Sequence, residues 1–254
     1  MHTYTWEAAD PRYLAVIAHG YGEHARRYDH VAGALMADGA SVVALDHHGH
    51  GRSEGERASV SDPQDFIADL DTLVDRAQER HPELPVVLIG HSMGGLIAAR
   101  YAQQHADKLA ALVLSAPVIG GNEAFAQLLA LDPIPEVPID PSVLSRDPAV
   151  GEAYAADPLV YHGAFRRETL ESLFAAIEAT ARGGEITLPT LWIHGEGDAL
   201  APLAATAPAA DAIGAARWQT KVYPGAMHEI FNETNRDEVI RDTIRFIDAA
   251  LARR

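Results

Sequence analysis

The 254-residue sequence contains no cysteine. A chain without thiols has no disulfide framework, no thiolate metal site and no cysteine nucleophile, so any covalent catalysis must use another side chain. The sequence also has no apolar run near the roughly 20 residues that would cross a bilayer. Its first residues lack a basic segment followed by an apolar core and a small-residue cleavage site. From these absences we expect a cytoplasmic protein.

Positive charge is scarce. Lysine and arginine number 20 against 36 acidic residues, which gives a formal net charge of −16. Such a surface repels phosphate backbones, and no basic run offsets it, so a nucleic-acid partner is excluded. The hydrophobic fraction of 48% and the charged fraction of 22% are ordinary for a globular protein, and the length suits one α/β domain.

Short apolar runs alternate with longer amphipathic segments, which is typical of an α/β fold with a mostly parallel central sheet flanked by helices. The chain before the first run has room for only one more strand. The spacing of apolar residues predicts helices over 28–36, 66–77, 93–105 and 236–252. Strands are predicted at Tyr13–Ala18, Ser41–Leu45, Pro85–Ile89, Leu109–Leu114, Thr190–His194 and Trp218–Tyr223.

Residues 118–186 interrupt this alternation. The segment is rich in proline and contains two short helical patterns, near 123–131 and 168–182. Because a loop of this length in a compact domain is commonly functional and regular strands resume after it, we interpret it as an inserted cap. The core would then comprise residues 1–117 and 187–254. The cap has 11 acidic and 4 basic residues, which favours a neutral ligand over a phosphate.

The sequence Gly90-His91-Ser92-Met93-Gly94 matches G-x-S-x-G between a predicted buried strand and a predicted helix. In a nucleophile elbow the serine occupies a strained turn, and the positions two before and two after it must be small. The turn also places Ser92 at a helix N-terminus, where free N–H groups favour developing negative charge. We therefore predict that Ser92 is a catalytic nucleophile.

A serine hydroxyl needs a base, and the histidine pKa suits that role near neutral pH. The chain order Ser, Asp or Glu, His requires a histidine late in the sequence. His228 follows the last predicted strand and precedes the last helix, so we predict that it is the base. His162, in the cap, and His194, at a strand end, are weaker candidates.

The acid that orients the histidine should follow a strand directly. Asp198 follows the strand that ends near His194, and the intervening glycines permit a tight turn. We favour Asp198 because it comes last in that turn. Glu196 and Glu123 remain alternatives. An imidazole without its acid would sample the wrong tautomer.

A tetrahedral intermediate needs two backbone N–H donors aimed at its oxygen. One should be the amide of Met93, directly after the nucleophile. The loop after the first predicted strand should supply the other, and Tyr21, flanked by Gly20 and Gly22, is the natural candidate.

Five motifs stand out along the chain: HGYGEHARRY (19–28), LDHHGHGRSEG (45–55), GHSMGG (90–95), HGEGDALAP (194–202) and YPGAMHEIFNE (223–233). With these motifs the sequence resembles the monoacylglycerol lipase and lysophospholipase branch of the α/β-hydrolases. The resemblance implies an α/β-hydrolase fold and a serine ester hydrolase that cleaves monoacylglycerols through an acyl-enzyme, without a cofactor.

The same resemblance assigns further roles. Tyr21 and Met93 take the oxyanion positions, and Glu23 and Arg27 lie near the polar end of the acyl pocket. The cap becomes a mobile hydrophobic gate that touches membranes or micelles transiently. Its expected wall residues include Phe125, Leu128, Leu129, Leu131 and Ile134.

Several alternatives stay open. A general carboxylesterase and a lysophospholipase would use the same residues, and a catalytically idle hydrolase fold would bind an apolar ligand instead. His47, His48 and His50 look like a metal cluster, but their spacing matches no zinc template, so we expect no metal site.

Overall fold

Seven strands form one sheet in the order β1-β3-β2-β4-β5-β6-β7 in the computed structural model, which describes residues 1–253. Only β1 pairs antiparallel, with β3, and all other neighbours are parallel. The predicted single strand before Tyr13 is thus present. The strands are β1 (His2–Trp6), β2 (Tyr13–Ala18), β3 (Ala40–Asp46), β4 (Val86–His91), β5 (Ala111–Ser115), β6 (Thr190–Gly195) and β7 (Trp218–Tyr223).

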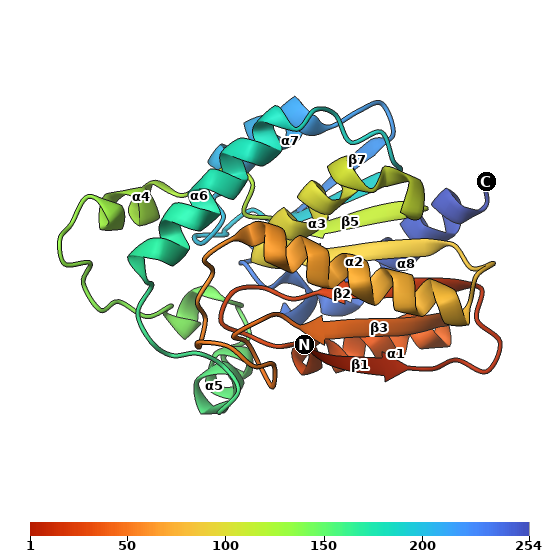
Figure 1. Ribbon diagram of the computed structural model, residues 1–254, viewed down its shortest axis with the longest axis horizontal. Coiled ribbons are helices and arrows are strands. Elements are labelled where there is room, and N and C mark those ends of the chain that lie inside the picture. The colour runs from red at the N-terminus through yellow and green to blue at the C-terminus, as the bar shows by residue number, and fades with distance from the viewer. Residues whose placement is uncertain (254) are drawn as a thin grey trace.

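Helices cover both faces of the sheet, because the side chains of buried strands alternate between two cores. Tyr13, Ala15 and Ile17 of β2 pack in the core under α1 (Asp29–Ala37) and α8 (Arg236–Leu251). Leu14 and Val16 face the opposite core, under α2 (Pro63–Arg80) and α3 (Met93–Gln104). In Figure 1, α2 and α3 lie in front of the sheet while α1 and α8 lie behind it.

Local sequence explains where the helices begin and end. The side chain of Asp62 accepts a hydrogen bond from the N–H of Gln64, and Pro63 opens α2, as preferred at a helix N-terminus. Gly39 follows α1 with φ +94°, a conformation that glycine adopts without strain. The helix α7 (Leu203–Ile213) follows the turn that carries Asp198.

The predicted cap contains α4 (Glu123–Leu129), α5 (Pro148–Ala156) and α6 (Arg167–Arg182), with a short 3-10 turn at Pro141–Val143. Sequence periodicity missed α5, because its alanine-rich segment has no clear apolar stripe. The helix α6 packs on α3 and α7. Figure 1 shows α4 and α5 projecting at the left, where the parallel strands end. Within residues 1–253, the helices are all too short or too polar to cross a bilayer.

Candidate active site

Ser92 forms the turn between β4 and α3, with φ 54° and ψ −118°. A positive φ is costly for a residue with a side chain and persists only where the surroundings enforce it. Here the N–H of Ser92 donates to the carbonyl of Ser115 at 3.0 Å. The carbonyl of Ser92 accepts from the N–H groups of Leu96 and Val118 at 3.1 and 3.2 Å. The strained turn is therefore fixed from both sides.

Glycine is required on both sides of this turn. A Cβ atom on Gly90 would lie 2.3 Å from the carbonyl oxygen of Gly94, and one on Gly94 would lie 2.2 Å from that of Ala18. A Cβ on Gly95 would approach Pro117 to 2.8 Å. The sequence-based requirement for small residues thus has a direct steric cause.

His228 connects Ser92 to Asp198. Nε2 of His228 lies 2.9 Å from Oγ of Ser92, and Nδ1 lies 2.8 Å from Oδ2 of Asp198. All three residues are at most 8% exposed. In the neutral imidazole, Nδ1–H donates to the carboxylate and Nε2 accepts from the hydroxyl, which is the arrangement that activates a serine.

The turn after β6 holds Asp198 in place. Its Oδ1 accepts the N–H groups of Leu200 and Ala201 at 2.9 and 2.8 Å, which leaves Oδ2 for the imidazole. Burial alone would raise the pKa of this carboxyl group, but His228, the N–H of Ala201 and His194 outweigh it and lower the pKa. Asp198 is therefore ionised at neutral pH.

The two alternative acids have other partners. Glu196 accepts the N–H of Gly225 at 3.0 Å on the surface. Glu123 lies in the first turn of α4, where its carboxylate accepts from the side chain of Gln127 at 3.3 Å. Neither is hydrogen-bonded to His228.

The electrostatic surroundings of His228 favour its protonated form. Burial lowers the pKa of His228, but the carboxylate of Asp198 raises it, as do Glu229 and Glu23, so that the net pKa lies above 6.5. An imidazolium formed during catalysis is thus stabilised by buried carboxylates.

The other candidate histidines have supporting contacts. Nε2–H of His194 donates to the carbonyl of Ala201 at 2.8 Å, beside Asp198. Nε2–H of His162 donates to the carbonyl of Asp157 at 3.1 Å, within the predicted cap. Sequence reasoning did not single out His91, whose ring centroid lies 4.8 Å from that of His228. Burial, reinforced by His228, lowers the pKa of His91 to about 4, so it is neutral.

The two predicted oxyanion donors lie at the edge of one cavity with the serine. Gly20, Tyr21, Ser92, Met93 and His228 all line it. Met93 is the first residue of α3, so its N–H has no partner in the helix's own ladder. A Cβ on Gly20 would lie 3.1 Å from Cβ of Ser92, which places the loop after β2 against the serine.

Glu23, Arg27 and Glu229 form a buried ion-pair network beside this loop. Nη1 of Arg27 donates to Glu23 at 2.8 Å and to Glu229 at 2.5 Å. Oε1 of Glu23 also accepts the N–H of Gly20 at 2.6 Å. Glu23 and Glu229 line the cavity, whereas Arg27 lines a separate polar depression on the far side of the network. Glu229 was not among the residues predicted from the sequence.

The rest of the cavity wall is mostly apolar. Phe125 lines it as expected, whereas Leu128 and Leu129 are half-buried elsewhere and are not lining residues. The helix α6 contributes four apolar residues to the wall, and their helical spacing in a charged helix was the available sequence signal. These lining residues of α6 are Leu170, Leu173, Phe174 and Ile177.

His47 and His50 lie buried against His19 and Phe66. Nε2 of His19 accepts the N–H of His47 at 2.9 Å. Burial lowers the pKa of all three histidines, so they are neutral packing groups. Among residues 1–253 there is no group of three or more His, Asp or Glu side chains that could hold a metal ion.

A serine, a histidine and an aspartate at the ends of these parallel strands define an α/β-hydrolase. Residues 9–235 match the family described as serine aminopeptidase, S33. The chain belongs to this family, in its monoacylglycerol lipase branch. The family and fold predicted from the sequence are thereby confirmed, and so is the class of ester hydrolase at the level of the family.

Three relatives illustrate the match. The monoacylglycerol lipase of Mycolicibacterium smegmatis is 40% identical over 94% of this chain and 89% of its own. The crystal structure of Paleococcus ferrophilus monoacylglycerol lipase superimposes with a TM-score of 0.84 at 27% identity, covering 98% of this chain and 100% of that one. A Bacillus coagulans carboxyl esterase in complex with glycerol gives a TM-score of 0.82 at 26% identity, covering 98% and 93%.

Proposed function

We propose that this protein hydrolyses monoacylglycerols to glycerol and a fatty acid, with Ser92 as nucleophile, His228 as base and Asp198 as the orienting acid. The observation that carries the proposal is the continuous hydrogen-bonded series from Asp198 through His228 to Ser92, with distances of 2.8 and 2.9 Å.

In the first half of the reaction, Nε2 of His228 takes the proton of Ser92 as Oγ attacks the ester carbonyl. The N–H groups of Tyr21 and Met93 donate to the resulting oxyanion, and each such donor is typically worth ~10²–10³ in rate. The imidazolium then gives its proton to the departing glycerol oxygen, which leaves an acyl-enzyme on Ser92. In the second half, His228 activates a water that releases the fatty acid.

The cavity supports a lipid ester with a small neutral alcohol. Its apolar walls suit an acyl chain, while Glu23 and Glu229 form a polar end that accepts hydroxyl donors. One arginine balances these two carboxylates from outside the cavity, so the polar end keeps a negative excess that repels a phosphate. The names of the relatives in Mycolicibacterium smegmatis and Paleococcus ferrophilus agree with this substrate class.

A general carboxylesterase is the second candidate, because the Bacillus coagulans relative bears that name. Initial rates on monoolein, lysophosphatidylcholine and p-nitrophenyl butyrate separate the possibilities. We expect the highest kcat/KM on monoolein. A preference for the butyrate ester would favour the carboxylesterase, and a preference for the phospholipid would favour a lysophospholipase. Failure on all three would leave the idle fold.

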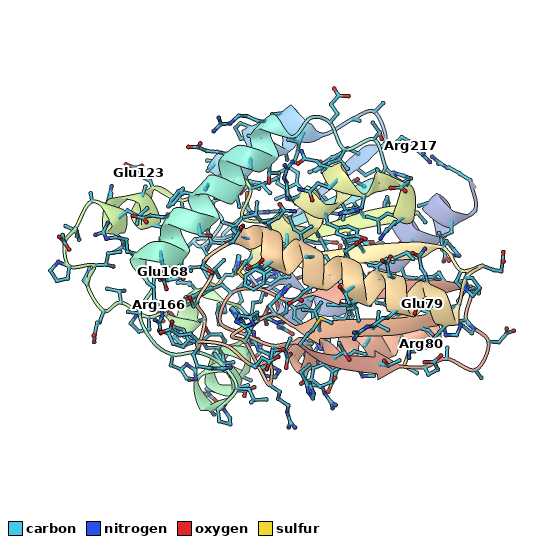
Figure 2. The ribbon with its side chains drawn as sticks, in the orientation of Figure 1. Glu79, Arg80, Glu123, Arg166, Glu168 and Arg217 are labelled. Atoms are coloured by element: carbon cyan, nitrogen blue, oxygen red, sulfur yellow. The ribbon has the colours of Figure 1, made fainter. Side chains whose placement is uncertain are left out.

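We also propose transient contact with lipid surfaces through the loop after α4. Leu131 and Val137, both in this loop, are large apolar side chains that are 49% and 50% exposed. Figure 2 places Glu123, at the start of α4, at the opposite end of the molecule from Arg217. Leu131→Asp with Val137→Asp should weaken sedimentation with phosphatidylcholine vesicles, whereas Ala216→Asp with Gln219→Asp near Arg217 should not. Equal sedimentation of both double variants would remove the proposal. The cytoplasmic location stays a prediction.

A further inference from the structure

One more carboxylate near His228 has no part in the mechanism above. Glu233 is five positions after the histidine, and its side chain is completely buried in a chain whose acidic residues otherwise lie mostly at the surface. Burial of a carboxylate is costly unless hydrogen bonds satisfy it. The contacts of Glu233 therefore indicate what the fold gains from placing it there.

Glu233 binds the backbone immediately before His228. Its Oε1 accepts the N–H of Met227 at 2.8 Å, and its Oε2 accepts the N–H of Thr234 at 2.8 Å. Burial would raise the pKa of Glu233, but the N–H groups of Met227, Arg146 and Thr234 lower it, so the group is ionised. Five hydrogen bonds converge on this one carboxylate.

Two of the five hydrogen bonds come from the cap. The backbone N–H and the Nε–H of Arg146 donate to Glu233 at 3.1 and 2.9 Å. Two further bonds join the same segments, because Oγ–H of Ser145 donates to the carbonyl of Asn232 and the N–H of Glu229 donates to the carbonyl of Leu144 at 2.8 Å. All three residues of the cap segment 144–146 are thus hydrogen-bonded to the histidine loop 227–233.

This junction also reaches the substrate cavity. Leu144 lines the cavity together with His228 and Glu229. One short cap segment therefore supplies a wall of the acyl pocket and, two residues later, the arginine that binds Glu233. The part of the cap that contains Leu131 and Val137 has no comparable attachment to this loop within residues 1–253.

We propose that Glu233 is a positioning residue for the general base: together with Arg146 of the cap, it fixes the backbone of Met227 and hence the distance between His228 and Ser92. The proposal rests on the proposed function of His228. It distinguishes the cap segment 144–146, which keeps the base in register, from the segment with Leu131 and Val137, which has no such bonds to the histidine loop.

The test compares Glu233→Gln with Arg146→Ala and Arg146→Lys. The N–H₂ group of a glutamine would face the N–H donors of Arg146 and Thr234 without an acceptor between them, so the loop must shift. Because a displacement near 1 Å at a catalytic group can cost about 10² in rate, we expect kcat to fall at least about tenfold with KM within about threefold. Arg146→Ala keeps the hydrogen bond between Glu233 and Met227, so its kcat should fall less. Arg146→Lys should recover part of that loss in kcat.

The readout that separates positioning from folding is kcat per reactive serine, counted by titration with a fluorophosphonate. The second-order rate of phosphonylation should fall in parallel with kcat, because that reaction needs the serine–histidine contact but no acyl pocket. Glu56→Gln is the matched control, since Glu56 binds Arg166 of the cap (labelled in Figure 2) without touching the histidine loop. It should keep kcat within about twofold of wild type.

Wild-type kcat per titrated serine in both Glu233→Gln and Arg146→Ala would overturn the proposal, even if their melting temperatures drop. Should Glu233→Gln fail to fold, the two Arg146 variants decide the question in the same assay. If the wild-type protein does not hydrolyse monoolein, the proposed substrate is wrong. The phosphonylation rates of the variants then still test the positioning role.

Discussion

Nε2 of His228 lies 2.9 Å from Oγ of Ser92 although 136 positions of sequence separate the two residues. The sheet order puts β5 and β6 between β4, which ends directly before Ser92, and β7, which precedes His228. The histidine loop must therefore cross the end of β6. Gly195 permits this crossing, because a Cβ there would lie 2.1 Å from the carbonyl oxygen of Met227.

Asp198→Asn should lower kcat by about 10⁴, the cost of the corresponding change in serine proteases, because the amide no longer selects the correct imidazole tautomer. Glu196→Gln is the matched variant in the same turn, and its surface contact with Gly225 predicts near wild-type turnover. Steady-state kinetics on monoolein measures both. A large loss of kcat in Glu196→Gln, together with near wild-type kcat in Asp198→Asn, would make Glu196 the orienting acid instead.

As the pH is lowered, kcat/KM should fall with a midpoint above the ordinary histidine pKa of 6.5. His228 acts as a base only when neutral, and Asp198, Glu229 and Glu23 hold its pKa above that value against the effect of burial. Activity is thus lost as pH falls through the raised pKa. Glu229→Gln removes one of the carboxylates, so this midpoint should move to lower pH, while Glu56→Gln should leave it in place. An upward shift in Glu229→Gln would contradict this electrostatic account.

Gly94→Ala should destabilise the protein through the elbow. The new Cβ would lie 2.2 Å from the carbonyl oxygen of Ala18 and 2.4 Å from that of His19, neither of which can move freely. Overpacking of this kind typically lowers the free energy of unfolding by about 1–3 kcal/mol. Gly33→Ala is the control, since its Cβ meets no atom within 4 Å in α1. It should stabilise by roughly 0.4–1 kcal/mol in urea unfolding.

The sequence was sufficient to predict the sheet and the elbow because their signals are local. The strands Tyr13–Ala18 and Trp218–Tyr223 are found at the predicted bounds, and Gly90 and Gly94 mark the turn at Ser92. The order of Asp198 and His228 along the chain was enough to nominate them. Their hydrogen bonds to each other and to Ser92 depend on the crossing loop, which no local pattern encodes.

The acyl pocket was harder to predict because its wall is assembled from distant segments. Periodicity indicated the helix that contains Leu170 and Ile177, yet nothing local says that this stripe faces a cavity instead of the core. The expected wall of α4 contributes Phe125 alone. Glu229 and Glu233 read as ordinary charged residues of a loop, because their burial follows from Arg27 and Arg146, which lie far away in the sequence.

The most direct test of the account is the site and rate of covalent modification of the serine. Wild-type protein treated with a fluorophosphonate should gain one adduct in its intact mass, and peptide mapping should place it on Ser92. His228→Gln should react at least about 10³ times more slowly, because the hydroxyl loses its base. An adduct on another residue, or equal rates in the two proteins, would contradict the claim that His228 activates Ser92.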